Sequence, residues 1–272
     1  MSKPPNGTPS HMQFAVNYST QLQNLLEKDH LPVDLIKCPE WDGIIAQSNK
    51  FRPVYVHFDI LLGLGLIQSL DFGKIRSLIA LTDTRHLNAH LVASPDMDPS
   101  SKADNLHLLK IWENELYQLS AAFGIRNIAV ENFPFMPYQP YQKMAVNADN
   151  IAQIVHSTGC GFLLDLAHAR ISSQVLGLNA QNYIESLPVD RLVEMHITGV
   201  KSYNGYLTDH FELQEADWQF AQWAIANIKS GHWQEPHVVA FEYGGVGEIF
   251  AWRTSQAVLE TQIPRMAQLI SS

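Results

Sequence analysis

The chain alternates short apolar runs with longer segments of helical periodicity, and this alternation restricts its fold more than any other feature. Eight runs are rich in β-branched and aromatic residues and have the length of buried strands. They are residues 12–18, 34–38, 54–58, 87–93, 127–132, 161–166, 192–199 and 237–243. Strands that alternate with helices form parallel sheets, because the helix carries the chain back to the same edge. The pattern predicts an α/β fold, a single (β/α)₈ TIM barrel over residues 12–272.

Four of the gaps between these runs carry apolar residues at helical spacing. They are residues 105–123, 147–157, 215–229 and 255–270. In the first, Leu106, Leu109, Leu116 and Leu119 form one apolar stripe, which is typical of a helix that packs on a sheet. The gap between Cys38 and Pro53 predicts only a short helix or none.

Residues 1–11 differ in composition from the rest of the chain. The opening MSKPPNGTPSHM is polar and rich in Pro and Gly, so we expect residues 1–11 to be a disordered tail or a cloning remnant, with Ser10-His11-Met12 as the scar. The predicted metalloenzyme domain therefore begins at Met12.

Composition excludes several classes of protein. The 18 Lys and Arg residues against 27 Asp and Glu residues give a net charge of -9, which argues against a nucleic-acid partner. Two cysteines, Cys38 and Cys160, are too few for a disulfide scaffold or a Cys-rich zinc module. No stretch reaches the ~20 apolar residues of a membrane span, and the start of the chain lacks the layout of a signal peptide. We therefore expect a cytoplasmic protein with no membrane partner.

Six consecutive predicted strands carry a polar residue near their C-terminal end. These residues are His57, His90, Glu131, Asp165, His196 and Glu242. In a barrel of parallel strands, the C-terminal ends meet at one face, and active sites are built there from several strands at once. The sequence therefore predicts three carboxylates and three imidazoles at one mouth.

This set of side chains indicates a metal centre. Crowded carboxylates repel one another unless a cation lies between them, and mixed oxygen and nitrogen ligands without thiolate suit Mn, Fe, Co or Zn. A single strand-end histidine is more often a hydrogen-bonded core residue, so His57 or His90 alone would not identify a site. Glu131, Asp165 and His196, with Glu242, are stronger candidates because they occupy the same relative place in their strands.

Three further residues lie within reach of the same mouth. His168 follows Asp165 by one helical turn, and the adjacent pair Asp209 and His210 follows the seventh strand. A surface loop also commonly carries such a pair. With these residues, the set is large enough for two or three metal ions.

The order of motifs resembles a known family. The segments YVHFDILLGLG, LNAHLVAS, NIAVENFPF, GFLLDLAHAR, LPVDRLVEMHITG, TDHFE and VVAFEYGG are similar to those of the multinuclear non-haem iron-dependent oxidative enzymes. That family was long described as a domain of unknown function, and it includes an enzyme of methanobactin biosynthesis. The most specific segment is Leu187 to Gly199, in which Leu-Pro-x-Asp-Arg precedes a Glu-x-His strand.

The resemblance implies a xylose-isomerase-like barrel and a set of iron ligands. Glu131, Asp165, His196 and Glu242 would hold a central iron, and His57 and His90 a second iron bridged to it. The family usually has Asp-x-Asn after strand six, where this chain has Ala167 followed by His168, and Asp-x-His where Asp209 and His210 are adjacent. We therefore expect two or three iron ions, with zinc or manganese as isolated substitutes.

The function that the resemblance implies is O₂-dependent oxidation of a residue, such as Cys, in a ribosomally synthesised peptide, which a separate partner protein presents in some members. Glu131, Glu242 and His168 are the candidate catalytic residues. The Asp-x-x-His spacing of Asp165 and His168 is also that of sugar isomerases, epimerases and endonuclease IV. A metal-dependent sugar isomerase or epimerase that acts on a small molecule, with Glu131 and Glu242 as its acid and base, is therefore an alternative. A barrel scaffold without metal is a second alternative.

Overall fold

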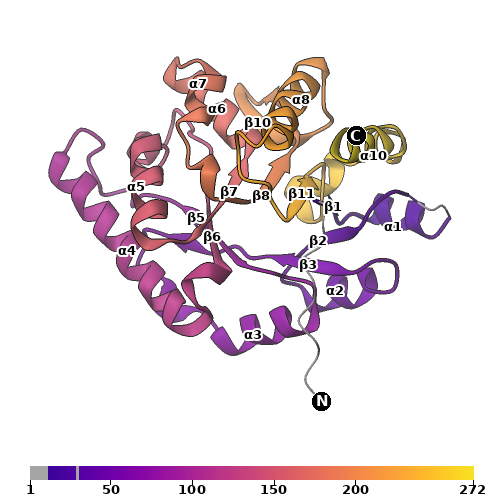
Figure 1. The fold of residues 1–272 in the computed structure, drawn as a ribbon, viewed down its shortest axis with the longest axis horizontal. Helices are drawn as coiled ribbons and strands as arrows, with labels where there is room; N and C mark the ends of the chain where they lie inside the picture. The colour runs from indigo at the N-terminus through magenta and orange to yellow at the C-terminus, as the bar shows by residue number, and fades with distance from the viewer. Residues whose placement is uncertain (1–11, 29–30) are drawn as a thin grey trace.

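A curled parallel sheet of nine strands lies at the centre of the computed structural model, which describes residues 12–28 and 31–272 (Figure 1). The strands are β1 Gln13–Asn17, β2 Leu35–Pro39, β3 Val54–His57, β4 Leu61–Leu62, β5 Leu87–Leu91, β6 Ile128–Glu131, β7 Gly161–Asp165, β8 Leu192–Ile197 and β11 Val238–Phe241. All eight predicted strands are present. The predicted N-terminal tail, residues 1–11, lies outside the described residues.

The sheet differs from the predicted ring of eight strands at one place. Its order is β3-β2-β1-β11-β8-β7-β6-β5-β4, so β3 and β4 lie at its two ends although they follow each other in the chain. Between them, the side chain of Asn88 on β5 accepts a hydrogen bond from the backbone N–H of Phe58 at 2.7 Å and donates to its carbonyl at 2.9 Å. A side chain thus replaces the backbone ladder there. The predicted third strand, residues 54–58, corresponds to β3, and β4 is an additional short strand that follows it.

Helices form the outer layer around this sheet (Figure 1). The α-helices are α1 Thr20–Leu26, α2 Asp42–Ser48, α3 Phe72–Leu81, α4 Lys102–Phe123, α5 Ala148–Thr158, α6 Leu166–Leu176, α7 Ala180–Glu185, α8 Glu215–Lys229, α9 Gly247–Phe250 and α10 Gln256–Ser271. The four predicted helices correspond to α4, α5, α8 and α10 with small differences at their ends. The short α2 fills the gap after Cys38, as expected.

Short polar side chains fix where several helices begin. Ser101 caps α4 and Asn147 caps α5, each by accepting the backbone N–H three residues later. Asp165 at the end of β7 caps α6 in the same way, with Oδ1 accepting the N–H of His168 at 2.7 Å. This leaves the second oxygen of Asp165 free to face the inside of the sheet.

Alternate residues of each strand pack on opposite sides of the sheet. Phe14, Val16, Ile36, Val54 and Val56 belong to the large core between the sheet and its helices. The intervening residues form a second apolar cluster on the inner side: Ala15, Leu35, Tyr55, Val238 and Ala240. Because side chains alternate along a strand, the residue two positions after each inner apolar residue also faces inward. This places a layer of polar residues above the inner cluster.

An antiparallel hairpin follows β8 and was not predicted from the sequence. It consists of β9 Gly199–Tyr203 and β10 Tyr206–Phe211. A register shift between Thr208 and Phe211, with a positive φ of 57° at His210, forms a bulge. This bulge turns both Asp209 and His210 toward the mouth of the sheet, although they are adjacent in sequence.

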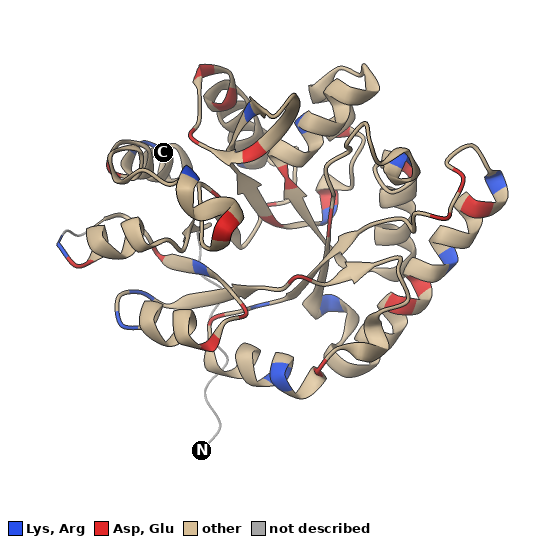
Figure 2. Ribbon diagram, turned by 180° about the vertical axis from the view of Figure 1, so that it is seen from behind, with Lys and Arg blue, Asp and Glu red and all other residues tan. Residues whose placement is uncertain are grey.

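Charged residues are distributed over the whole ribbon. Figure 2 shows the described lysines and arginines as separate short blue segments on different elements. None of the helices in the described ranges combines the length and the hydrophobicity of a bilayer span.

Candidate metal centre

At the C-terminal ends of the strands, the inner face of the sheet carries eight polar side chains. In order along the chain, these residues are Asn17, Lys37, His57, His90, Glu131, Asp165, His196 and Glu242. The strand register sets His90 beside Glu131 and Asp165 beside His196. All six strand-end residues predicted from the sequence therefore lie together, and their assignment as metal ligands stays a prediction.

The first group of candidate ligands consists of His57, His90 and Glu131. Their ligand atoms lie within 4.8 Å of one another. Oε2 of Glu131 is 3.5 Å from Nε2 of His57 and 3.2 Å from Nε2 of His90. Burial disfavours the charged imidazole and holds the pKa of His57 well below its usual value. A neutral imidazole is the form that binds a metal ion.

The second group consists of Asp165, His196 and Glu242. Nδ1 of His196 is 3.8 Å from Oδ2 of Asp165 and 3.3 Å from Oε2 of Glu242. It is also 3.5 Å from Oε1 of Glu131. Glu131 therefore directs one oxygen to each group, which is the geometry of a carboxylate that can bridge two ions.

Glu194 supports His196 from the layer below. Its Oε1 lies 2.7 Å from Nε2 of His196 and accepts the hydroxyl of Tyr55 at 2.9 Å, while its Oε2 lies 2.7 Å from Nε2 of His86. Burial alone would raise the pKa of Glu194, but the hydrogen bonds of His196 and His86 hold it well below its usual range. A carboxylate in this position fixes the ring of a metal-binding histidine and orients its other nitrogen.

His168 lies at the mouth but both of its ring nitrogens face protein oxygens. Nδ1 is 2.9 Å from the carbonyl of Asn132, and Nε2 is 2.9 Å from Oδ2 of Asp209. Burial opposes the charge, but Asp165 and Asp209 outweigh it and raise the pKa of His168 to about 10. His168 is therefore a protonated hydrogen-bond donor in this arrangement.

Asp209 and His210 reach the mouth from the bulge in β10. Asp209 pairs with His168, whereas Nδ1 of His210 lies 3.0 Å from the carbonyl of Gly244 and its ring lies 4.2 Å from that of Phe250. Neither residue is in the groups of His, Cys, Asp and Glu side chains that can hold an ion among the described residues. His168 does belong to one such group, with Glu131 and Asp165. Asp209 is paired with His168, and His210 is bonded to the backbone.

Lys37 is one of the eight inward-facing strand-end residues, and sequence reasoning missed it. Its side chain is only 2% exposed, and its ammonium group pairs with Oε1 of Glu242 and lies 3.4 Å from Nδ1 of His196. Glu194 and His86 were also missed as site residues. The available signal was the presence of Lys37 and Glu194 inside runs that are otherwise apolar, since charged residues in buried strands need partners.

The polar atoms of the centre fit a bound cation. Oε2 of Glu131 and Oδ2 of Asp165 are buried and have no hydrogen-bond partner in the structure. Buried carboxylate oxygens without partners are costly, and a divalent ion between them removes that cost. Their oxygen and imidazole donors suit iron, manganese or zinc.

The centre opens into a cavity of about 610 Å³ with aromatic side chains at its margin. Trp41 and Phe250 line the cavity itself. Farther out, the rings of Tyr138 and Tyr206 lie 5.0 Å apart, and those of Tyr203 and Trp252 lie 5.1 Å apart. We call Trp41, Tyr138, Tyr203, Tyr206 and Trp252 the aromatic rim; all five side chains are exposed.

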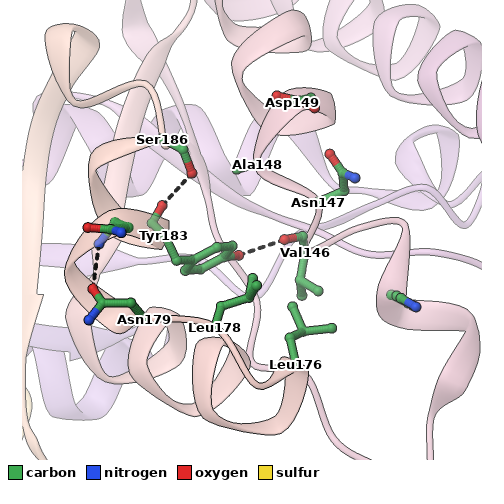
Figure 3. A pocket seen from close by; sticks show the side chains of 11 residues that line it. Val146, Asn147, Ala148, Asp149, Leu176, Leu178, Asn179, Tyr183 and Ser186 are labelled. Atoms are coloured by element: carbon green, nitrogen blue, oxygen red, sulfur yellow. Dashed lines mark hydrogen bonds between the residues drawn. The ribbon is translucent and has the colours of Figure 1, made fainter.

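A second hollow of about 620 Å³ lies between α5 and α7 (Figure 3). Its polar groups are largely bonded to one another: the hydroxyl of Tyr183 donates to the carbonyl of Val146 at 2.6 Å, and that of Ser186 to the carbonyl of Tyr183 at 2.6 Å. None of the ion-binding groups of the described residues lies in it. We therefore assign the functional site to the mouth of the sheet.

Comparison with known proteins places the chain in a family. Residues 42–232 match the family model described as RiPP precursor modification enzyme MbnB/TglH/ChrH, in which RiPP denotes a ribosomally synthesised and post-translationally modified peptide. The chain belongs to this family. The resemblance drawn from the motifs is thereby confirmed.

One relative and two solved structures show what the chain is similar to. A UPF0276 protein of Chromobacterium violaceum is 30% identical over 198 residues, which are 68% of this chain and 70% of that protein. The crystal structure of a D-psicose 3-epimerase in the presence of D-fructose matches with a TM-score of 0.54 at 13% identity, covering 96% of this chain and 97% of that one.

Endonuclease IV from Thermus thermophilus matches with a TM-score of 0.53 at 14% identity, covering 91% of this chain and 99% of that one. At such low identities these two structures establish the fold alone. This MbnB/TglH/ChrH protein therefore shares the fold of the xylose-isomerase-like barrels.

Proposed function

We propose that the protein is an O₂-dependent oxidase that uses two or three iron ions to modify a residue, Cys in the first instance, of a ribosomally synthesised peptide. The observation that carries this proposal is the pair of imidazoles, His57 and His90, whose Nε2 atoms both lie within 3.5 Å of Oε2 of Glu131. A single-metal isomerase has no chemical need for this second group of ligands.

Two groups of side chains would hold the ions. His57, His90 and Glu131 would bind one iron, and Glu131, Asp165 and His196, with Glu242, would bind the other. Iron held in this way supplies the reductive activation of O₂ that an organic side chain cannot perform. The partnerless oxygens of Glu131 and Asp165 support this arrangement.

The protein's own groups would position the reactants. Glu194 keeps the ring of His196 fixed, so that Nδ1 stays directed at the centre. His168 holds Asp209 through Nε2 at the margin of the cavity, so it would act on a bound substrate through Asp209. These contacts support His168 as a group that positions Asp209.

A peptide suits the margin of the cavity better than a small sugar does. The aromatic rim extends beyond the cavity, and exposed aromatic side chains of this kind supply contact area at protein and peptide interfaces. A sugar that fits inside the cavity would leave most of the rim unused.

A metal-dependent sugar isomerase or epimerase remains the alternative that one observation favours. Glu131 and Glu242 approach Nδ1 of His196 from different strands, at 3.5 and 3.3 Å. Two carboxylates close to one metal-binding position would be suited to moving a proton between neighbouring carbons.

Oxygen uptake distinguishes the two functions. Reduced, iron-loaded protein is mixed with a Cys-containing peptide encoded beside its gene, and O₂ uptake and peptide mass are followed. We expect uptake and a mass change, both abolished by His90→Ala while the central metal is retained. The matched control is His107→Ala, on the exposed face of α4, which leaves both unchanged.

The protein's own thiols do not confuse this experiment. Cys38 and Cys160 are both buried. Burial raises the pKa of Cys38 to about 12, although a hydrogen bond with Ser48 lowers it. The added peptide therefore supplies the reactive thiol at neutral pH. If no peptide stimulates uptake but a ketose is converted under nitrogen with manganese bound, the isomerase replaces the oxidase. Protein that purifies and reloads without metal would instead indicate a scaffold.

A further inference from the structure

One of the eight inward-facing strand-end residues is a lysine. Six of the others are imidazoles and carboxylates, the candidate ligands, whereas β1 contributes Asn17 and β2 contributes Lys37. Its register partner on β1 is Asn17, and its inner neighbour one step below is Leu35. The side chain is thus fixed by an apolar layer beneath it and can extend only toward the centre.

The ammonium group of Lys37 contacts two residues of one candidate ligand group. It pairs with Oε1 of Glu242 and lies 3.4 Å from Nδ1 of His196. Both residues belong to the Asp165, His196 and Glu242 group. The other oxygen of Glu242, Oε2, faces the ring of His196 at 3.3 Å. One positive charge therefore already lies against two of the three residues of that group.

Lys37 is also the one lysine or arginine among the described residues that line the cavity. Five carboxylates share that lining, those of Glu40, Asp59, Glu131, Asp209 and Glu242. The attraction between a buried ammonium and a buried carboxylate offsets the cost of desolvating both. Loss of one partner is costly, because the other charge stays buried and unpaired. A metal ion that binds Glu242 has to displace the ammonium group of Lys37 in this way.

We propose that Lys37 competes with the metal for Glu242 and thereby sets how tightly the Asp165, His196 and Glu242 group binds its ion. This inference rests on the proposed metal centre. The hydrogen-bonding contacts of Lys37 reach Glu242 and His196, so its charge acts most directly on the Asp165, His196 and Glu242 group. The two groups consequently fill in order, with the imidazole pair first.

The test compares Fe(II) binding by the full chain and its Lys37→Met variant under anaerobic conditions, with elemental analysis and thermal melting as readouts. Methionine is one heavy atom shorter than lysine and fills most of the same space without charge. We expect the metal-free variant to melt lower than the wild type, and its second Fe(II) to bind at least tenfold more tightly. Lys37→Gln, which keeps an N–H donor, gives the same result if the Met variant does not fold.

A matched control and the contrary outcomes make the test specific. Lys201→Met removes a lysine that pairs with Glu212 at the surface, and it leaves Fe(II) affinity unchanged. Wild-type affinity and stoichiometry in both Lys37 variants would show that Lys37 is only structural. Weaker binding would show that it helps to hold the ion. Both outcomes overturn the inference, whereas absence of Fe(II) from wild type and variants alike would overturn the proposed function as well.

Discussion

Glu194 lies in the layer below the strand-end residues and contacts the ring of His196. Its two oxygens accept from three side chains, one of which is the His196 ring at 2.7 Å. Because the ring could otherwise rotate or exchange its nitrogens, this contact decides which atom faces the ligand group. The site therefore includes a lower layer of residues that orient the candidate ligands.

Replacement of Glu194 by Gln should weaken metal binding. An amide can donate to His196 instead of accepting from it, so the imidazole loses its preferred orientation. We expect about a 10- to 100-fold loss of Fe(II) affinity, as for other supporting residues of metal sites. Anaerobic Fe(II) titration measures it, with Glu212→Gln as the surface control. Equal affinity in both variants would contradict the role given to Glu194.

At this scale the sequence predicts which residues face the centre better than it predicts their partners. The strand-end pattern brought His57, His90 and Glu131 together correctly, because period-two alternation and parallel strands fix the direction of each side chain. It could not reveal that Lys37 pairs with Glu242, since the two are 205 residues apart and meet only through the curvature of the sheet.

At the scale of elements, the hairpin of β9 and β10 extends the site beyond the sheet. It carries Tyr203 and Tyr206, whose rings pack on Trp252 and Tyr138 from two other connections. The bulge in the same hairpin brings Asp209 to His168. One element thus joins the aromatic rim to the polar mouth.

Removal of the two hairpin tyrosines should affect the substrate and not the metal. For Tyr203→Ser combined with Tyr206→Ser, we expect an increase of about tenfold or more in KM for the peptide, since aromatic anchors dominate interface energies. Metal content and kcat stay close to wild type. Steady-state O₂ uptake measures this, and Tyr117→Ser on α4, an exposed tyrosine, is the control. Loss of metal with unchanged KM would contradict the assignment.

Elements with strong periodicity were predicted well, and those built from local backbone geometry were not. The limits of α8 match the predicted residues 215–229, because its apolar stripe repeats over four turns. The hairpin escaped prediction because its strands are half exposed and lack a continuous apolar run. The gap in the sheet between β3 and β4 escaped prediction because it depends on the hydrogen bonds of the Asn88 side chain with Phe58.

At the scale of the whole molecule, the centre joins strands that are distant in the chain, so a bound ion should stabilise the entire fold. Saturation at 100 times Kd adds about 2.7 kcal/mol to the free energy of unfolding, which for a chain of this size raises Tm by roughly 5–10 °C. Thermal melts of chelator-treated and anaerobically Fe(II)-reloaded protein measure the shift. The Glu131→Gln variant should show a much smaller one. Identical Tm values with and without Fe(II) would argue against a centre that links the strands.

The eight inward-facing strand-end residues occupy equivalent positions, and this matters for the evolution and engineering of such proteins. Each position offers one side chain at the mouth, supported by the layer of inward-facing residues below, so a codon change at one position alters the ion or the reaction while the scaffold persists. The metal chemistry of a descendant can therefore diverge one strand at a time. A library restricted to Asn17 and His57 would explore new reactivities without altering the apolar cores or the buried Lys37–Glu242 pair.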